Sequence, residues 1–433
     1  MHNYKLRQQV LLDKLDVASV AIIFGAKIIN RNSDSQMLFR QHSDILYLTG
    51  FNEPDCCLVL TKDYSGKSKV TMFLQPKDPI AECWNGKRLG IDEGIKVLGL
   101  DAAFPLCDLE KHLTDLCANK QNLYYSFSAN TQNDLCVLKT LEIVKQGMRR
   151  GAQAPDTIRD LSLLLHEQRL IKDDYEKELM YQAASISAKA HNKLIKACKP
   201  GLFEYQLEAI FTHHVQYNGC RTLAYPAIVA TGANACILHY TNNEDELKDG
   251  DLLLIDAGGE YKGYSADITR TFPVNGKFTS AQKDIYELVL RAQLAGIDAV
   301  KIGLPLNGVQ DSILEVMIPG LIDLKILTGN KDDILKNQSY KKVYMHGSGH
   351  WLGLDTHDVG RYKLDNNWRD FEPGMVITVE PGLYIPEDSN IPSQYHNIGV
   401  RIEDDVFVGK NGPVILSEEV PKTISEIEAM MAS

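Results

Sequence analysis

Residues 255–273 read IDAGGEYKGYSADITRTFP, and this stretch predicts a β-hairpin that carries two acids. Asp256 ends an apolar run, Asp267 lies in a second strand-like run, and turn-forming residues separate them. If the turn centres on Tyr261 and Lys262, the two aspartates lie opposite each other on one face. Two carboxylates so close repel each other unless a proton or a cation lies between them. The hairpin therefore predicts a cation site, and the alternative is two unrelated aspartates in solvent.

Two glutamates end further apolar runs. Glu380 follows four strand-forming residues in VITVEPGLYIP (376–386), and Glu403 follows a similar run in GVRIEDDV (399–406). Glutamate is disfavoured within strands, and a buried acid needs a partner. A second pair of carboxylates that converges on the first would hold two hard or borderline cations. The alternative for each glutamate alone is an exposed surface position.

Three histidines lie in MHGSGHWLGLDTHD (345–358): His346, His350 and His357. The intervening glycines disfavour a zinc-binding helix, and Leu352 breaks the pattern of a phosphate-binding glycine loop. One of the histidines would complete the cation site, and the other two would act as nearby acids or hydrogen-bond donors. The candidate ligands include four carboxylates and no cysteine. This donor set favours Mn²⁺, with Co²⁺, Fe²⁺ or Zn²⁺ as alternatives.

The composition restricts the function further. The chain has 433 residues, a formal net charge of −11, 44% hydrophobic and 24% charged residues, and nine cysteines. The acidic balance argues against nucleic-acid binding, and no apolar run is long enough for a membrane span. The odd number of cysteines, without C-x-x-C pairs, fits a reducing cytosol. No signal-peptide pattern precedes the apolar run at 17–25, so we expect a cytoplasmic enzyme.

The length predicts two domains. Strand-like and helical runs alternate over residues 1–171, which predicts an N-terminal α/β domain. Residues 172–433 predict an α+β domain with antiparallel hairpins. A charged helical stretch at 169–198, whose main helix Asp173 or Asp174 caps, lies at the start of this domain. The predicted strands there are 251–258, 265–273, 375–382 and 398–408, and the predicted helices are 204–218, 279–302 and 306–318.

The order of Asp256, Asp267, His350, Glu380 and Glu403, with these flanking residues, resembles the five-ligand set of the pita-bread metallopeptidases. The flanking stretches are most similar to the bacterial aminopeptidase P branch, and RNSDSQMLFRQHSDILYLTGFNEPD (31–55) and AECWNGKRLG (81–90) resemble its leading domain. The resemblance implies a catalytic domain with a curved, mostly antiparallel sheet. It also implies release of the first residue from peptides that have proline at the second position.

The resemblance implies a role for each ligand around two divalent cations, with Mn²⁺ expected. Asp256 would chelate one cation, Asp267 and Glu403 would bridge both, and His350 and Glu380 would complete one each. A water or hydroxide between the cations would attack the first peptide bond, and Glu380 would also shuttle the proton.

Further residues acquire roles from the same resemblance. His357 matches the histidine that stabilises the oxyanion, and His239 matches one that binds substrate near the scissile bond. His346 has no settled role, Arg401 would contact a glutamate or the substrate, and Tyr384 would line the pocket. Asp34 and Trp84 of the leading domain would reach a neighbouring subunit's site, which implies a homotetramer or at least a homodimer. Alternatively, Asp34 is an ordinary loop residue and Trp84 packs in an interface.

Other members of the family offer alternative functions. The prolidases that resemble this chain carry a longer insert between the two glutamate strands, creatinase lacks the ligands, and methionine aminopeptidase usually lacks the leading domain. The runner-up is a prolidase that cleaves Xaa-Pro dipeptides. A catalytically silent peptide-binding relative is the alternative from another class, and the intact ligand set argues against it.

Overall fold

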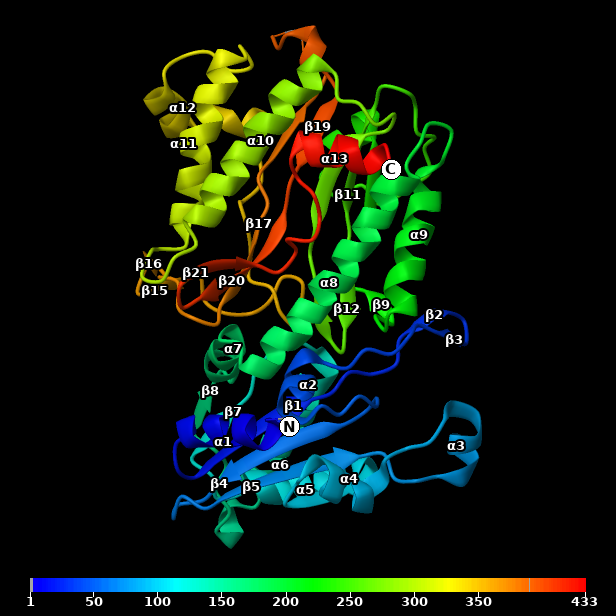
Figure 1. Cartoon of the computed structure of the whole chain (residues 1–433). Helices are drawn as coiled ribbons and strands as arrows, with labels where there is room; N and C mark the ends of the chain where they lie inside the picture. The colour runs from blue at the N-terminus through cyan, green and yellow to red at the C-terminus, as the bar shows by residue number, and fades with distance from the viewer. Residues whose placement is uncertain (1–2, 389) are drawn as a thin grey trace. The chain divides into compact units, whose positions relative to one another are not determined.

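A computed structural model of the chain describes residues 3–388 and 390–433 (Figure 1). The chain divides into two compact units, Met1–Arg169 and Leu170–Ser433. The domain boundary expected from the sequence, between residues 171 and 172, falls in the short segment that joins helix α7 (Ser162–Leu170) to helix α8 (Asp174–Ala197).

The N-terminal unit is built on a six-stranded mixed sheet of order β6-β5-β4-β1-β7-β8. The central strands are antiparallel, and the outer strands β6, β7 and β8 each pair in parallel with a neighbour. The strands are β1 (Ser19–Phe24), β4 (Cys57–Lys62), β5 (Ser68–Leu74), β6 (Ala102–Pro105), β7 (Asn122–Tyr124) and β8 (Thr157–Arg159), with a separate small hairpin of β2 (Asn30–Asn32) and β3 (Ser35–Gln36). This mixture of strand directions is that of an α/β domain.

Helices cover this sheet. Alternate residues Val20 and Ile22 of β1 pack into a core with Leu113 and Leu141 of two helices, as the period of two along a strand requires. The helices of the unit are α1 (Tyr4–Lys14), α2 (Ser43–Thr49), α3 (Pro79–Asn85), α4 (Gly90–Leu98), α5 (Leu109–Cys117), α6 (Thr131–Gln146) and α7, with short 3₁₀ turns at Leu106–Asp108 and Met148–Arg150.

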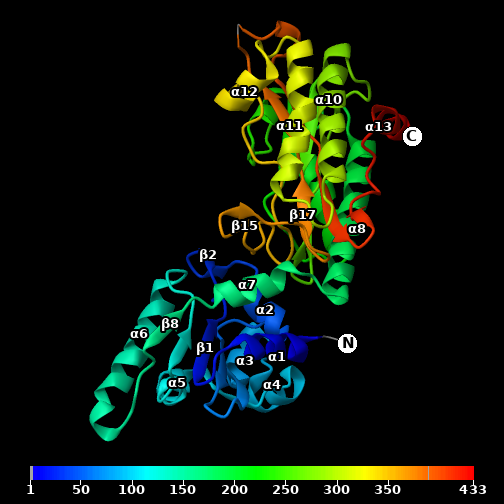
Figure 2. The same cartoon turned by 90° about the vertical axis from the view of Figure 1, so that its left-hand side faces the viewer.

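In the C-terminal unit, long helices lie along the strands (Figure 1). The turned view shows α10 and α11 side by side (Figure 2). Its helices are α8, α9 (Glu204–Tyr217), α10 (Ser280–Asp298), α11 (Asn307–Asp323), α12 (Lys331–Asn337) and α13 (Ile424–Met431), with 3₁₀ turns η3 (Gly232–Cys236), η4 (Ser339–Lys342) and η5 (Ser393–Tyr395). Asp173 caps α8 and forms a capping box with Glu176, which confirms one of the two expected caps. Across the described ranges, no helix has both the length and the apolar character that a membrane crossing requires.

All strand pairs of the C-terminal unit are antiparallel within the described residues. They form sheets of order β10-β11-β14, β13-β12-β9, β17-β20-β21, β18-β19 and β15-β16. The strands are β9 (Thr222–Leu223), β10 (Ile228–Thr231), β11 (Leu252–Asp256), β12 (Gly259–Tyr261), β13 (Tyr264–Ser265), β14 (Thr269–Pro273), β15 (Lys363–Leu364), β16 (Asn367–Trp368), β17 (Val376–Val379), β18 (Gly382–Ile385), β19 (Ile398–Arg401), β20 (Asp404–Gly409) and β21 (Gly412–Ile415).

Side chains alternate along these strands, so a hydrophobic face is separated from an acidic one. In β11, Leu253 and Ile255 belong to the main core with the long helices, so Asp256 points to the opposite face. In β17, Ile377 and Val379 belong to the same core, so the next residue, Glu380, also points away from it. The helices therefore bury one face of the strands and leave the other face for the acids.

Several predicted long strands are interrupted at the acids. The predicted strand 375–382 is split into β17 and β18 at Glu380, and the predicted strand 398–408 is split into β19 and β20 before and at Glu403. Pro381 has no N–H to donate to a ladder, which explains the first interruption. At the second, Glu403 bonds instead to the end of β14, where its N–H donates to the Thr269 carbonyl at 3.1 Å. The two segments nevertheless stay paired with each other in one register, with Val379 opposite Asp404 and Gly382 opposite Arg401. Glu380 and Glu403 therefore stand at a short gap in a single antiparallel ladder.

A buried ion pair joins the strands on the helix-covered side. The Arg270 guanidinium donates to Asp404 Oδ1 at 2.7 Å and to the carbonyl of Glu403 at 2.6 Å, and both side chains of the ion pair are 0% exposed. The carboxylate of Asp404 also accepts hydrogen bonds from Gln293 and Lys422. These bonds satisfy the buried charges and fix the main chain that carries Glu403.

Because Arg270 would be left as a buried charge without its carboxylate, we expect Asp404→Asn to lower the free energy of unfolding of the metal-free chain by about 3–5 kcal/mol. Chemical denaturation of the full chain measures this loss. The matched control is Asp298→Asn, which breaks an exposed ion pair with Lys301, and we expect it to cost less than about 1 kcal/mol. Equal effects of the two variants would contradict the assignment.

Candidate metal centre

The two aspartates of the hairpin lie on one face, but two residues out of the expected register. Asp256 pairs with Thr269, and Asp267 follows the short strand β13. The turn centres on Lys262 and Gly263, which both have positive φ, at 51° and 90°. Such a turn matches the twist of the flanking strands, and it moves the pairing by two positions, which leaves the face unchanged.

Tyr225 joins the two aspartates. Its hydroxyl lies 2.6 Å from Asp256 Oδ1 and 2.5 Å from Asp267 Oδ1, and its single proton is shared between them. Opposite Asp267, Gly258 allows the two chains to approach, because a Cβ there would stand 1.7 Å from the Ala266 carbonyl oxygen. The aspartates are thus neighbours through side chains and through a close backbone contact.

The two glutamates complete the acidic face. The last paired residues of β17 and β20 are Val379 and Asp404, so Glu380 and Glu403 stand at the next positions of the two strands. Thr269 donates its hydroxyl to Glu403 Oε2 at 2.6 Å. Thr378 lies 3.2 Å from Glu380 Oε1 through its own hydroxyl. Both carboxylates therefore have a threonine on the same face to orient them.

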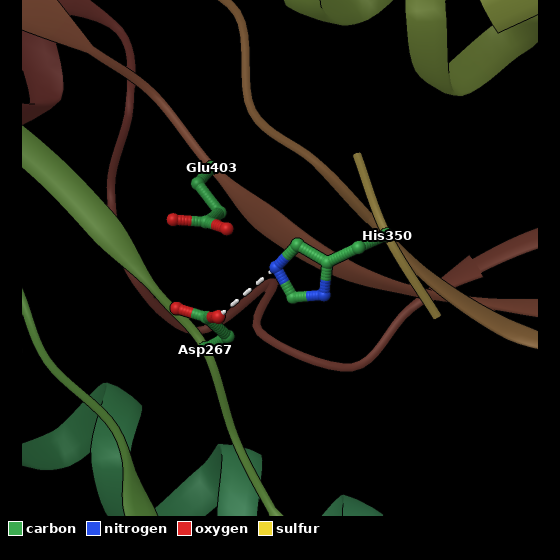
Figure 3. Close-up of side chains that lie close together, drawn as sticks. All are labelled: Asp267, His350 and Glu403. Atoms are coloured by element: carbon green, nitrogen blue, oxygen red, sulfur yellow. Dashed lines mark ion pairs between the residues drawn. The ribbon is translucent and has the colours of Figure 1, made fainter. Parts of the chain in front are cut away.

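His350 faces Asp267 and Glu403, as Figure 3 shows. Its Nε2 lies 3.5 Å from Asp267 Oδ2 and 3.6 Å from Glu380 Oε1, while Nδ1 lies 3.0 Å from the Trp351 carbonyl, to which it donates. This bond leaves Nε2 directed at the carboxylates. Asp267, His350 and Glu403 offer ligand atoms that all lie within 4.8 Å of one another.

The protonation of this cluster reflects its crowding. Burial raises the pKa of Glu380 to about 7, and burial together with Asp267 and Glu380 raises that of Glu403 well above its usual value. Burial also raises the pKa of Asp267. Burial lowers the pKa of His350, but the hydrogen bond and charge of Asp267, with the charge of Glu380, outweigh it and bring the pKa to about 9. Without a cation, protons must offset the repulsion between the carboxylates, and divalent cations fit the same oxygen-rich set.

A chain of hydrogen bonds orients Asp256. Arg401 donates from Nη2 to Asp256 Oδ2 at 2.6 Å and from Nη1 to the Tyr384 hydroxyl at 2.8 Å. The Tyr384 hydroxyl lies 2.8 Å from His346 Nε2, and His346 Nδ1 lies 2.7 Å from the Gly347 carbonyl. Since Nδ1 donates to that carbonyl, Nε2 accepts from Tyr384. His346, Tyr384 and Arg401 therefore form one connected group beside the acids.

Two further predicted histidines border the centre. The ring of His357 lies edge-on to His350 with 4.3 Å between ring centroids, and burial lowers the pKa of His357. His239 is exposed and lies in the segment after η3. Its charge contributes to lowering the pKa of both His346 and His357, after the larger effect of burial. The structure therefore brings all three predicted auxiliary histidines near the acids.

The two remaining predicted site residues belong to the N-terminal unit. Asp34 lies exposed in the turn between β2 and β3, and Trp84 lies in α3 with 83% of its surface exposed. Their participation in a site stays a prediction.

Sequence reasoning missed Tyr225 and the two threonines. Tyr225 precedes β10 in an ordinary apolar context, so no spacing relates it to the hairpin it joins. Thr269 could have been found, because it follows Asp267 by two residues and so shares its face. Thr378 could have been found in the same way, since it precedes Glu380 by two.

Comparison with known proteins identifies the family. The model of metallopeptidase family M24 matches residues 178–410, and that of the aminopeptidase P N-terminal domain matches residues 4–125. The chain belongs to metallopeptidase family M24. It is 42% identical over 430 residues to the Xaa-Pro aminopeptidase of Escherichia coli, an alignment that covers 99% of this chain and 97% of that protein.

Solved structures of M24 relatives have the same fold as this chain. Proline aminopeptidase P II from Yersinia pestis is 43% identical, with a TM-score of 0.97 and 99% of both chains covered. A zinc-substituted aminopeptidase P from E. coli in complex with product is 42% identical, with a TM-score of 0.97 over 99% of this chain and 98% of that one. The predicted fold class, an N-terminal α/β domain followed by an α+β pita-bread domain with mostly antiparallel strands, is confirmed. This M24 protein is a divalent-metal peptidase.

Since Tyr225 holds two carboxylates of the M24 centre, we expect Tyr225→Phe to weaken the binding of a divalent cation by about 10- to 100-fold, the usual effect of losing a residue that orients ligands. Calorimetric titration of the metal-stripped protein measures the affinity without any turnover. Tyr217→Phe, at a tyrosine that is 82% exposed, is the control. Unchanged affinity in Tyr225→Phe would show that the hydroxyl does not position the aspartates.

Proposed function

We propose that this protein is an Xaa-Pro aminopeptidase, which removes the first residue from peptides that have proline at the second position. The observation that carries the proposal is the gathering of four carboxylates and one imidazole at the ends of neighbouring strands, in the ligand order expected of the family. The full-length similarity to relatives named Xaa-Pro aminopeptidase supports the specificity. Proline has no N–H in its peptide bond and a fixed φ, so a dedicated enzyme is needed for it.

The proposed metal ligands are Asp256, Asp267, His350, Glu380 and Glu403. Oxygen-rich donors with one imidazole suit two Mn²⁺ ions, and the crowding of carboxylates with raised pKa values supports a doubly charged partner for them. When bound, the cations would lower the pKa of water and polarise the carbonyl of the scissile bond. Asp256, Asp267, Glu380 and Glu403 would hold these ions through their carboxylate oxygens, and His350 would hold them through its imidazole nitrogen.

Glu380 is the residue placed to move a proton. It directly follows β17 and stands beside Glu403, and its Oε2 lies 3.8 Å from His346 Nδ1. From there its carboxylate would accept the proton of the attacking water and deliver it to the leaving proline nitrogen. Thr378 restricts the rotation of this carboxylate.

The histidines and the arginine would bind and orient the substrate. His357 would donate to the oxyanion that forms at the scissile carbonyl, and His239 would bind the peptide near that bond. Arg401 keeps Asp256 oriented through its 2.6 Å contact, with Tyr384 and His346 behind it. Tyr384 would line the pocket beside them.

The remaining elements of the proposal concern assembly and location. We propose a homotetramer or a homodimer in which Asp34 and Trp84 reach the centre of a neighbouring copy. The 83% exposure of Trp84 supports this, since so large an exposed aromatic side chain suits an interface. The cysteine pattern supports a cytoplasmic location.

The proposal predicts that the metal-stripped protein regains cleavage of an Xaa-Pro-Yaa tripeptide when Mn²⁺ is added, with little cleavage of an Xaa-Pro dipeptide. Release of the free first residue measures both reactions. A preference for the dipeptide would make the protein a prolidase. Bound Mn²⁺ without cleavage of either peptide would favour a silent peptide-binding protein.

Asp256→Ala and Glu380→Ala should each reduce turnover of the tripeptide by at least about 100-fold, since losing a ligand costs more than losing a residue that orients one. Glu380→Ala should remain folded, because this side chain points away from the helix-covered core. Asp256→Ala should remain folded because Arg401 keeps its hydrogen bonds to Tyr384 and Thr269. Asp298→Asn, at an exposed ion pair, serves as the control. Wild-type turnover by either alanine variant would overturn the site assignment.

A further inference from the structure

Glu204 is a buried carboxylate that lies outside the metal centre and accepts four hydrogen bonds. It is the first residue of α9 and is 0% exposed. Its donors are the backbone N–H of Thr231 at 2.7 Å, Asn234 Nδ2 at 3.2 Å, the Tyr240 hydroxyl at 2.9 Å and the backbone N–H of Asp245 at 3.0 Å. The two oxygens of a carboxylate offer about four acceptor positions, so the hydrogen-bonding capacity of this side chain is filled.

All four donors belong to one segment, residues 231–245. Thr231 begins the segment at the end of β10 and Asp245 ends it, so a single carboxylate joins its two ends. The backbone N–H of Glu204 also donates to the Asp245 carbonyl at 3.0 Å. His239 lies inside this segment, directly before Tyr240.

A second carboxylate of α9 holds the same segment one helical turn later. Glu208 accepts from Asn243 Nδ2 at 2.9 Å. Asn243 is 2% exposed and has a φ of 54°, and its side chain also bonds Val229 and Ala227 in and beside β10. Glu204, Glu208 and Asn243 together form what we call the α9 clamp.

The other side of the segment faces the metal centre. Ala235 lies in a small apolar cluster with Leu254 and Tyr384, and Leu238 and Tyr240 pack against this cluster. Gly399 permits the contact, because a Cβ there would stand 2.3 Å from the Ala235 carbonyl oxygen. The segment is therefore held between the α9 clamp and Tyr384, whose hydroxyl bonds His346 and Arg401.

We propose that Glu204 is a positioning residue for substrate binding: through the α9 clamp it fixes the segment that presents His239 to the peptide. This inference rests on the proposed function, because it assigns the peptide to His239. Glu204 contacts none of the proposed metal ligands, so its effect falls on the substrate and leaves the cations in place. His239 is exposed and no core packing holds its side chain, which is why its main chain must be fixed by polar bonds.

The test is Glu204→Gln, which keeps the shape but turns an amide NH₂ toward donors. We expect the KM for an Xaa-Pro-Yaa tripeptide to rise by about tenfold with little change in kcat, as loss of uniform substrate binding requires. Mn²⁺ affinity should change little, because Glu204 contacts none of the proposed metal ligands. Amide hydrogen exchange should quicken at Thr231 and Asp245, whose N–H groups donate to Glu204. Tyr240→Phe removes one of the four bonds and should give a smaller shift in the same direction.

Glu246→Gln is the matched control, because this acid is exposed beside the segment and accepts none of the four bonds. A wild-type KM in Glu204→Gln would overturn the proposal, and so would a parallel loss of Mn²⁺ affinity, which would show a general structural role. If the wild-type protein cleaves no Xaa-Pro peptide, the proposed function fails first. In that case, amide hydrogen exchange at Thr231 and Asp245 alone tests whether Glu204 fixes the segment.

Discussion

Repulsion between carboxylates is the constraint around which the C-terminal unit is organised. Asp267, Glu380 and Glu403 are buried close together, and each has a raised pKa because burial and neighbouring charge disfavour its ionised form. A fold that only had to be stable would not gather these groups, since an apolar set of the same volume would cost less. The cluster is tolerable because hydroxyl and guanidinium groups share the charge, and because divalent cations can bind there.

The strands connect this cluster to the hydrophobic core. A period of two along β11 and β17 directs Asp256 and Glu380 away from a row of aliphatic side chains, so packing of the long helices helps to fix the direction of these two carboxylates. On the side that the helices cover, the Arg270 guanidinium bonds both Asp404 and the main-chain carbonyl of Glu403. This buried arginine therefore stabilises the main chain from which the Glu403 carboxylate projects on the opposite side. Stability and site geometry therefore depend on the same few main-chain positions.

The sequence predicts the parts of this arrangement that periodicity controls. Apolar alternation indicated the strands, their faces and the acids at their ends, and family resemblance supplied the order of the ligands. The register of the hairpin was wrong by two residues because Lys262 adopts a positive φ, which propensity alone does not favour for lysine. Tyr225 and Glu204 escaped notice because their partners are distant in the chain, at Asp267 and at residues 231–245.

Loops and strands hold their functional side chains by different means. A strand acid is fixed by burial of its neighbours, but a histidine on a loop has no aliphatic row behind it. The segment with His239 is instead held by Glu204, and the loop with His357 is held by its next residue, Asp358, which forms a 2.9 Å ion pair with Lys172 in which both side chains are 1% exposed. Buried polar bonds are directional and costly to leave unmade, so each one selects a single loop conformation. The proposed metal-binding acids thus depend both on packing behind their strands and on hydrogen bonds from hydroxyl and guanidinium groups beside them. The loops that carry His239 and His357 depend on buried charge instead.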